Sequence, residues 1–264
     1  MPRRFGFLPL NRAALEGELL FYNQLIADQY VAEGWDPEAI FVARNCLDQA
    51  PIQAARRAWQ DAPERLEVFR RENKIGPGPN ILFVSRLHPT NRLELLVQAT
   101  AELLKEFPEA EIFIIGQGDA EQQRLEQLAA SIGISDRLRF VGAIYDEMQL
   151  VPWFLSSDIF CYPANIGLSL LHAFGYGLPV VTSDNMAGQN PEIEAIRPGK
   201  NGLLYTDGDA SALADALRAI ATDREQANAM SVEAIRTVEE EFTLENMVAG
   251  MAAAVRYCAR TKPS

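Results

Sequence analysis

The sequence predicts an α/β fold in which helices flank a doubly wound parallel sheet, a Rossmann-like arrangement. Six short apolar segments between residues 80 and 206 alternate with segments whose apolar residues recur every three or four positions. The turns between them are rich in Gly, Asn, Asp and Pro. Because short strands that alternate with amphipathic helices form parallel sheets with helices on both faces, residues 77–223 are predicted to be one complete domain.

The six strands of this domain are expected at the apolar runs, which are residues 80–85, 111–116, 137–142, 158–163, 178–183 and 201–206. The helices follow the three-and-four spacing of apolar side chains, and they are residues 91–107, 121–133, 146–157, 168–177 and 210–221. Asp209 precedes the last of these helices and is expected to be its N-cap, because its carboxylate can accept from the N–H groups of the first turn.

The segment before this domain is predicted to be mostly helical. Residues 12–33 are expected to form one helix that Gly34 closes, and residues 39–44 one strand. Residues 52–73 are expected to be helical with an interruption at Pro63.

Length sets the domain organisation. Residues 1–76 are too few for a second sheet domain, since a compact domain usually has ~100–150 residues. The GPGP stretch at 76–79 is a linker, and residues 224–264 are predicted to supply two further helices.

Composition and charge narrow the range of functions. The chain has 264 residues, 48% of them hydrophobic, and a formal net charge of −12. A nucleic acid repels so acidic a chain and is not expected as a partner. No apolar run reaches the ~20 residues of a membrane span and no signal-peptide core is present, so a cytoplasmic location is expected. Three cysteines without metal-ligand spacing and two histidines predict neither a disulfide scaffold nor a metal site.

Open parallel sheets bind ligands beyond the carboxyl ends of their strands. In PANIGLSLL (163–171), the backbone N–H groups near Ile166, Gly167 and Leu168 are expected to point outward at a helix N-terminus. Such a group of donors suits an anion, and a phosphate best. The alternative is an ordinary strand–helix corner, in which Asn165 is the N-cap and Gly167 serves packing.

Two arginines lie at the same edge of the predicted sheet. Arg86 directly follows the first strand and Arg92 begins the next helix. Together they form a plausible diphosphate clamp; taken singly, each is an ordinary surface charge. Gly116 and Gly118 in GQGD allow backbone N–H groups to approach a ligand. They form only a fragment of a dinucleotide-binding motif, because the third glycine is missing, and no NTPase phosphate loop is present.

These motifs, taken in order, resemble the donor-binding C-terminal domain of retaining glycosyltransferases of family 4, which have the two-domain GT-B fold. The stretches that carry the resemblance are SRL, LELLVQA, IIGQGD, RFVGAI, DIFCYP, IGLSLLHAFGYGLPVV, NPEIEAI and NGLLYTDGDASALADAL, between residues 85 and 217. Residues 27–48 resemble the end of the family's N-terminal domain. The resemblance thus implies that residues 1–76 are a remnant of that domain with its linker.

The resemblance implies a role for several positions. Arg86 would bind the donor diphosphate. The family's assisting lysine stands five positions later, where this sequence has Asn91 with Arg92 beside it. The backbone at Gly142–Ile144 would hold the nucleotide base, and the backbone at Ile166–Leu168 would receive the distal phosphate and the sugar.

The family also has two glutamates, one at the sugar and one at the ribose, in the positions that Ala164 and His172 occupy here. The imidazole of His172 would hydrogen-bond a ribose hydroxyl; the alternative is a histidine that only packs in its helix. Glu192, in the NPE stretch, is the next candidate for an acid near the donor sugar, or else an ordinary acid at a helix N-terminus.

The implied activity is transfer of a hexose, with retention, from a nucleotide-diphosphate sugar to an acceptor hydroxyl in glycan or polysaccharide synthesis, without a bound metal. Arg86 and Arg92 would stabilise the departing diphosphate. The acceptor would be a glycan or a lipid-linked molecule, which allows a location at the inner face of the membrane. A second chain is a candidate source of the acceptor domain.

Two other functions stay open. One is a non-catalytic nucleotide-sugar-binding module or partner subunit, and the other is a different doubly wound protein such as a GT-B epimerase or an NAD-binding domain. The resemblance also implies that the last helix packs on the N-terminal domain. An exposed apolar stripe is therefore expected on it, unless residues 12–33 cover that stripe, with Leu244, Met247, Met251 and Val255.

Overall fold

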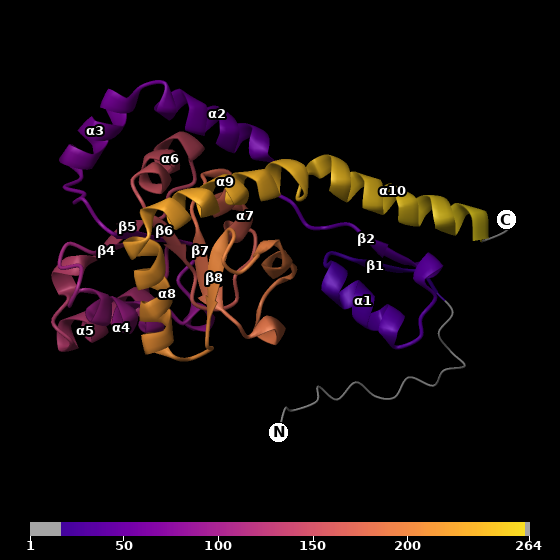
Figure 1. Ribbon diagram of the computed structural model, residues 1–264, viewed down its shortest axis with the longest axis horizontal. Coiled ribbons are helices and arrows are strands. Elements are labelled where there is room, and N and C mark those ends of the chain that lie inside the picture. Colours follow the sequence, from indigo (N-terminus) through magenta and orange to yellow (C-terminus); the bar gives the residue numbers. More distant parts are fainter. Residues whose placement is uncertain (1–16, 262–264) are drawn as a thin grey trace. The chain divides into compact units, whose positions relative to one another are not determined.

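The computed structural model describes residues 17–261, and its largest feature is a parallel sheet of six strands (Figure 1). The strand order is β5-β4-β3-β6-β7-β8, and each neighbouring pair is parallel. The strands are β3 (Asn80–Val84), β4 (Glu111–Ile115), β5 (Leu138–Gly142), β6 (Ile159–Cys161), β7 (Val180–Ser183) and β8 (Gly202–Tyr205). Each lies inside a predicted strand, so the doubly wound α/β fold is confirmed.

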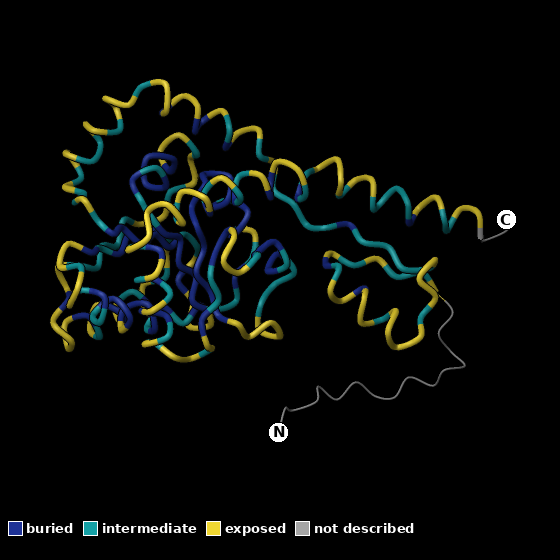
Figure 2. The backbone as a smooth tube through the Cα atoms, viewed as in Figure 1, coloured by how far each residue is buried: buried dark blue, intermediate teal, exposed yellow. Residues whose placement is uncertain are grey.

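The main core lies on both faces of this sheet. Ile81, Leu82 and Phe83 of β3 are all fully buried, although successive side chains of a strand point to opposite faces. A strand buried on both faces needs apolar residues at every position, which explains the continuous apolar runs in the sequence. Figure 2 shows the buried backbone concentrated in the sheet and in the helix turns that face it.

Helices cover both faces of the sheet. On one face α4 packs against α5 and α8, and on the other α6 and α7 pack against α2 (Figure 1). The bounds are α2 (Gln49–Gln60), α3 (Pro63–Glu72), α4 (Leu93–Leu103), α5 (Asp119–Ser131), α6 (Glu147–Leu155), α7 (Ser169–Gly175), α8 (Ala210–Thr222) and α9 (Arg224–Glu240). Asp209 caps α8 as predicted, because its Oδ1 accepts from the N–H groups of Ser211 and Ala212 at 2.9 and 3.0 Å.

The order of the strands reverses at the centre of the sheet. The chain passes from β3 outward to β4 and β5, and then returns through α6 to β6 on the other side of β3. Because such crossovers are right-handed, α4 and α7, which follow the two central strands, cover opposite faces. Their loops diverge at the carboxyl ends of β3 and β6, where doubly wound sheets bind their ligands.

By their internal contacts, the described residues fall into two units. The larger is residues 46–244, and the smaller combines the residues up to Asn45 with those from Glu245 on. Both predicted domain boundaries, after residues 76 and 223, fall inside the larger unit. They do so because α2 packs against α6 and α7, and α9 packs against α7.

The prediction of one helix over residues 12–33 is wrong. Residues 12–16 lie outside the described residues; the rest forms β1 (Leu19–Phe21) and then α1 (Gln24–Ala32). β1 pairs in parallel with β2 (Ile40–Val42), which confirms the strand predicted at 39–44. A short apolar run does not distinguish strand from helix by periodicity, and the N-cap signal of Asn23 was missed. The Asn23 Oδ1 accepts from the Ile26 N–H at 3.1 Å.

The last helix, α10 (Leu244–Thr261), packs on β2 at a glycine. A Cβ atom at Gly250 would lie 2.1 Å from the Val42 carbonyl oxygen, so the helix backbone rests directly on the strand. The predicted apolar stripe is confirmed in part: Leu244 and Val255 are exposed, together with Val248, whereas Met247 and Met251 are half-buried.

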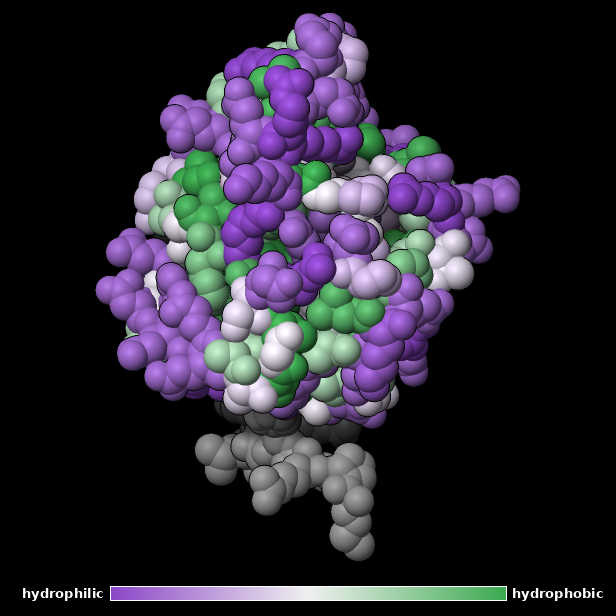
Figure 3. Space-filling model, turned by 90° about the vertical axis from the view of Figure 1, so that its left-hand side faces the viewer, coloured by the Kyte–Doolittle hydropathy of each residue, from purple (hydrophilic) through white to green (hydrophobic). Residues whose placement is uncertain are grey.

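None of the helices between residues 17 and 261 is long and apolar enough to cross a membrane. Figure 3 shows one face of the molecule, on which hydrophilic residues cover most of the surface and hydrophobic residues form separate groups between them.

We expect Gly250→Ala to destabilise the smaller unit. Alanine improves helix propensity by about 1 kcal/mol, but its Cβ forces α10 away from β2, and overpacking of this kind costs about 1–3 kcal/mol. Amide hydrogen exchange of residues 40–45 should therefore be faster than in the wild type. Val255→Ala is the matched control, because Val255 is 68% exposed on the same helix. Equal exchange in the two variants would contradict this packing.

Candidate functional site

The carboxyl edge of the sheet contains an open pocket between the loops that follow the central strands. Its volume is about 520 Å³, within the ~300–1,000 Å³ usual for small-molecule sites. Residues from the loops after β3, β6, β7 and β8 line it: Pro89, Thr90, Arg92, Ala164, Asn165, Ser183, Asn185, Gly188 and Asp207. The pocket therefore lies where the topology predicts a ligand.

Arg86 lies at this edge, on a loop whose backbone is fixed. Its carbonyl oxygen accepts from the Asn91 side chain at 3.0 Å. The Ser85 N–H donates to the carbonyl of Ile115 at the end of β4, and the Leu87 N–H donates to that of Gln117 in the loop after it. The Arg86 side chain is exposed and makes no ion pair with another residue in the range 17–261. A fixed backbone with an uncommitted guanidinium suits recognition of an anionic ligand.

Gly116 and Gly118 allow this loop to come close to the loop after β4. A Cβ atom at Gly116 would lie 1.8 Å from the Ser85 carbonyl oxygen, and one at Gly118 would lie 2.4 Å from that of Leu87. Their role in the structure is thus to admit the backbone that carries Arg86. The direct ligand contact expected of these glycines stays a prediction.

Asn91 occupies a buried position between the two central loops. Its Nδ2 donates to the Tyr162 hydroxyl at 3.0 Å, and that hydroxyl donates to the Ser85 Oγ at 3.2 Å. Burial raises the pKa of Tyr162, against smaller opposing effects of the Ser85 hydrogen bond and the Arg86 charge, so the phenol stays protonated. Asn91 therefore ties the loop after β3 to the loop after β6 and presents little surface to a ligand.

Arg92 is already paired with acids. Its Nη1 lies 3.1 Å from the Asp207 Oδ1, and its Nε lies 3.9 Å from the Glu94 Oε1. Its backbone is left-handed, with φ of 54°, which turns the chain into α4. Arg92 lines the pocket, but the Asp207 carboxylate partly neutralises its charge there. The charge of Arg86 is not neutralised by an ion pair with any residue in the range 17–261.

The loop before α7 is held by the chain that follows β7. The Ile166 N–H donates to the Gln189 Oε1 at 2.7 Å, so it is not among the outward-pointing donors that the sequence predicted. Asn165 has φ of 64° and is not an N-cap; α7 has no side-chain cap. The Asn190 Nδ2 donates to the Asn165 carbonyl oxygen at 3.1 Å and stabilises this left-handed turn.

Two N–H groups of the same loop have no such partner. Neither Gly167 nor Leu168 donates its N–H to another residue between 17 and 261, and the Leu168 side chain is 41% exposed. Glu192 follows Asn190 by two residues, in the 3₁₀ helix η6 (Pro191–Ala195), and is buried. The sequence did not predict the roles of Gln189 and Asn190. Their side chains hold the loop before α7, which is 23 to 25 residues away in the sequence, and such a contact leaves no local sequence pattern.

The loop between β5 and α6 is open to solvent on the same edge. Gly142 has φ of 91°, and nothing lies within 4 Å of the Cβ position there. Its carbonyl oxygen accepts from the Gly116 N–H at 3.0 Å, while Ile144 packs against the core. Tyr145 is 90% exposed, which the sequence did not single out. Backbone groups at Gly142 and Ala143 are thus accessible to a flat ligand such as a base.

His172 does not stand alone in α7. Its Nε2 lies 2.9 Å from the Glu147 Oε1, and the Tyr176 hydroxyl donates to the same oxygen. Burial acts to raise the pKa of Glu147, but the hydrogen bonds from His172 and Tyr176 and the charge of His172 hold it below its usual value. Burial, together with the Glu147 carboxylate, raises the pKa of Tyr176 well above its usual range. Glu147 is therefore a carboxylate at neutral pH.

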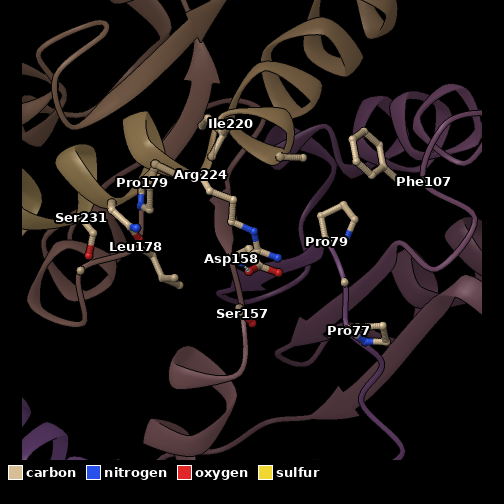
Figure 4. Close-up of a pocket in the computed structure, with 15 residues that line it drawn as sticks. Pro77, Pro79, Phe107, Ser157, Asp158, Leu178, Pro179, Ile220, Arg224 and Ser231 are labelled. Carbon is tan, nitrogen blue, oxygen red and sulfur yellow. Dashed lines mark ion pairs between the residues drawn. The ribbon is translucent and has the colours of Figure 1, made fainter.

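A second pocket lies at the opposite, amino edge of the sheet (Figure 4). There Arg224 lies beside Asp158, with 3.8 Å between the Nη1 and Oδ1 atoms. The Asp158 Oδ2 accepts from the Asn80 N–H at 2.8 Å, at the start of β3. Parallel sheets do not bind ligands at this edge, and Asp158 serves to fix the entry of β3.

Comparison with known proteins identifies the family of the chain. A family model described as glycosyl transferases group 1 matches residues 78–223. The chain belongs to this family. The match spans the six-stranded domain, so the loops at the carboxyl edge of the sheet are those of a group 1 glycosyltransferase domain.

Curated relatives agree with this assignment. The D-inositol 3-phosphate glycosyltransferase of Nocardia farcinica is 32% identical over 202 residues, which are 73% of this chain and 43% of the relative. The phosphatidyl-myo-inositol mannosyltransferase of Mycobacterium leprae is 32% identical over 167 residues, which are 60% of this chain and 42% of the relative. The chain thus spans less than half the length of these relatives.

Solved glycosyltransferase structures share the fold. The Rickettsia africae glycosyltransferase superposes with a TM-score of 0.76 at 17% identity, over 93% of this chain and 64% of that one. Anabaena Alr3699/HepE in complex with UDP superposes with a TM-score of 0.74 at 18% identity, over 91% and 64% of the two chains. These neighbours have the GT-B fold, of which this chain has one Rossmann-like half.

We expect Gly116→Ala to destabilise the group 1 domain. The new Cβ clashes with the backbone of Ser85, which cannot move without disrupting the loop after β3, so the loss is about 1–3 kcal/mol or more. Urea denaturation measures it. Gly76→Ala is the matched control, because its Cβ would meet only the Glu109 carboxylate at 3.7 Å. If the two variants unfold at the same urea concentration, the close approach of the two loops is wrong.

Proposed function

We propose that the chain is the donor-binding part of a retaining hexosyltransferase of family 4, and that it binds a nucleotide-diphosphate sugar at the carboxyl edge of its sheet. The observation that carries this proposal is Arg86, an exposed guanidinium on a fixed loop beside the switch point of a glycosyltransferase domain. Its placement supports recognition of a diphosphate, the most highly charged part of the donor.

In the proposed reaction, the bond between the sugar anomeric carbon and the distal phosphate oxygen breaks, and a bond to the acceptor oxygen forms on the same face. The proton of the acceptor hydroxyl passes to the departing diphosphate. Negative charge develops on the departing diphosphate. Arg86 would neutralise most of it, with the N–H groups of Gly167 and Leu168. Arg92 contributes less than the sequence suggested, since Asp207 holds it at 3.1 Å. The residues, and not a metal ion, supply the positive charge in this mechanism.

The names of similar proteins suggest the classes of donor and acceptor. Alr3699/HepE has been solved with UDP and with UDP-glucose, and a relative in Mycobacterium tuberculosis is named for its dependence on GDP-mannose. We propose a UDP- or GDP-hexose as donor, and a glycan or lipid-linked acceptor at the cytoplasmic face of a membrane. In this proposal the acceptor-binding domain corresponds to the part of the relatives that this chain does not match, and a second chain is one proposed source of it.

A second function is favoured by two residues that line the pocket. Ala164 lines the pocket where the family has a glutamate, and Arg92 is paired with Asp207. A domain with these changes can bind a nucleotide sugar without transferring it, as a regulatory or partner subunit. Sugar transfer to an acceptor, in the presence of an acceptor domain, distinguishes the enzyme from such a subunit.

Calorimetric titration with UDP, GDP and their hexose conjugates tests the proposed site. We expect saturable binding of one nucleotide, and a dissociation constant about 10–100 times larger in Arg86→Ala, because a hydrogen bond to a charged group contributes about 1.5–3 kcal/mol. Arg71→Ala is the matched control, since Arg71 is an exposed arginine on α3. A folded chain that binds none of these ligands, or a wild-type affinity in Arg86→Ala, would contradict the proposal.

A further inference from the structure

The cluster of Glu147, His172 and Tyr176 suggests a function for a residue that no motif predicted. The carboxylate of Glu147 receives two hydrogen bonds on the same oxygen, Oε1: one from the Nε2 of His172 at 2.9 Å and one from the hydroxyl of Tyr176. A carboxylate only accepts hydrogen bonds, so His172 carries a proton on Nε2. The second oxygen, Oε2, receives no hydrogen bond from any residue in the range 17–261.

Aromatic packing fixes the geometry of this carboxylate. The His172 ring lies 4.8 Å from the ring of Phe154, and the Tyr176 ring stacks on Phe154 at 4.6 Å. Tyr176 is buried, whereas the Glu147 side chain keeps 29% of its surface exposed. The carboxylate is thus held from one side by two donors on rigid rings, and its remaining oxygen is available to a ligand.

The cluster lies on the two helices that follow the loops proposed to hold the base and the distal phosphate of a nucleotide. Glu147 begins α6, three residues after Ile144 in the loop proposed to hold the base. His172 belongs to α7, four residues after Leu168 in the loop proposed to receive the distal phosphate. The hydrogen bond between Glu147 and His172 therefore joins the helices that follow these two loops. In a nucleoside diphosphate, the ribose connects the base to the phosphates and carries two adjacent hydroxyl donors.

We propose that the Glu147 Oε2 accepts a hydrogen bond from a ribose hydroxyl of the bound nucleotide, and that His172 and Tyr176 position this carboxylate. The inference rests on the proposed function, because it needs a nucleotide at the carboxyl edge. It assigns the direct contact to Glu147 and a positioning role to His172, and it makes the site selective for ribonucleotides over deoxyribonucleotides.

The test compares each nucleotide with a form that lacks one hydroxyl. Dissociation constants of UDP and GDP, and of their 2′-deoxy and 3′-deoxy forms, are measured by calorimetry for the wild type and Glu147→Gln. The wild type should bind at least one deoxy form about tenfold more weakly, since a hydrogen bond to a carboxylate is lost. In Glu147→Gln, the ratio of the dissociation constant of the deoxy form to that of the ribose form should fall below about threefold. The affinity for the deoxy form should be nearly unchanged.

Two further variants make the result decisive. Glu126→Gln is the matched control, because Glu126 is a carboxylate on α5 that accepts from Gln122, and it should leave every constant unchanged. Tyr176→Phe keeps the ring and removes the hydroxyl that holds Glu147. Tyr176→Phe should lower the ratio of the deoxy to the ribose dissociation constant at least twofold. If Glu147→Gln does not fold, this variant tests the inference in its place.

The outcomes separate this inference from the proposed function. If Glu147→Gln weakened the binding of the ribose and deoxy forms equally, the cluster would only join α6 to α7. That result would overturn the inference. A wild type that binds nucleotides without preferring ribose would do the same and would leave the proposed function standing. Failure of the wild type to bind any of these nucleotides would overturn both.

Discussion

The close packing of the loop after β3 on the loop after β4 is the constraint on which the site depends. Two glycines, Gly116 and Gly118, leave room for the backbone from Ser85 to Leu87, and main-chain hydrogen bonds then fix it. Because the backbone is held in this way, Arg86 needs no partner of its own and can keep its charge exposed at the carboxyl edge. A side chain at either glycine would displace the loop, and with it the guanidinium, from the switch point of the sheet.

Neutral polar side chains connect the other loops of this edge to one another. Asn91 joins the loop after β3 to Tyr162 after β6, and Gln189 and Asn190, after β7, hold Asn165 and Ile166. Such contacts order the loops before a ligand arrives, which reduces the conformational cost of binding. Asn91 thus serves the structure of the crevice, and Arg86 is an exposed cation beside it.

The sequence was sufficient for the six strands and most of the helices, since continuous apolar runs and helical spacing report burial directly. It failed at β1, because three apolar residues in a row show neither a helical nor a strand period. At the site it located Arg86 and the loop before α7 from their places after strands. It could not show that Asp207 pairs with Arg92 or that Glu147 meets His172, because these partners lie 115 and 25 residues apart.

Arg86 is an exposed cation at the carboxyl edge, whereas Arg92, in the pocket, is paired with Asp207 at 3.1 Å. Sugar transfer depends on nucleotide binding at the carboxyl edge. The most direct measurement is a crystal structure of the chain grown with UDP and, separately, with GDP. We expect a diphosphate within hydrogen-bonding distance of the Arg86 guanidinium, beside the loops after β3 and β6. A nucleotide bound instead in the amino-edge pocket beside Arg224 would contradict this expectation.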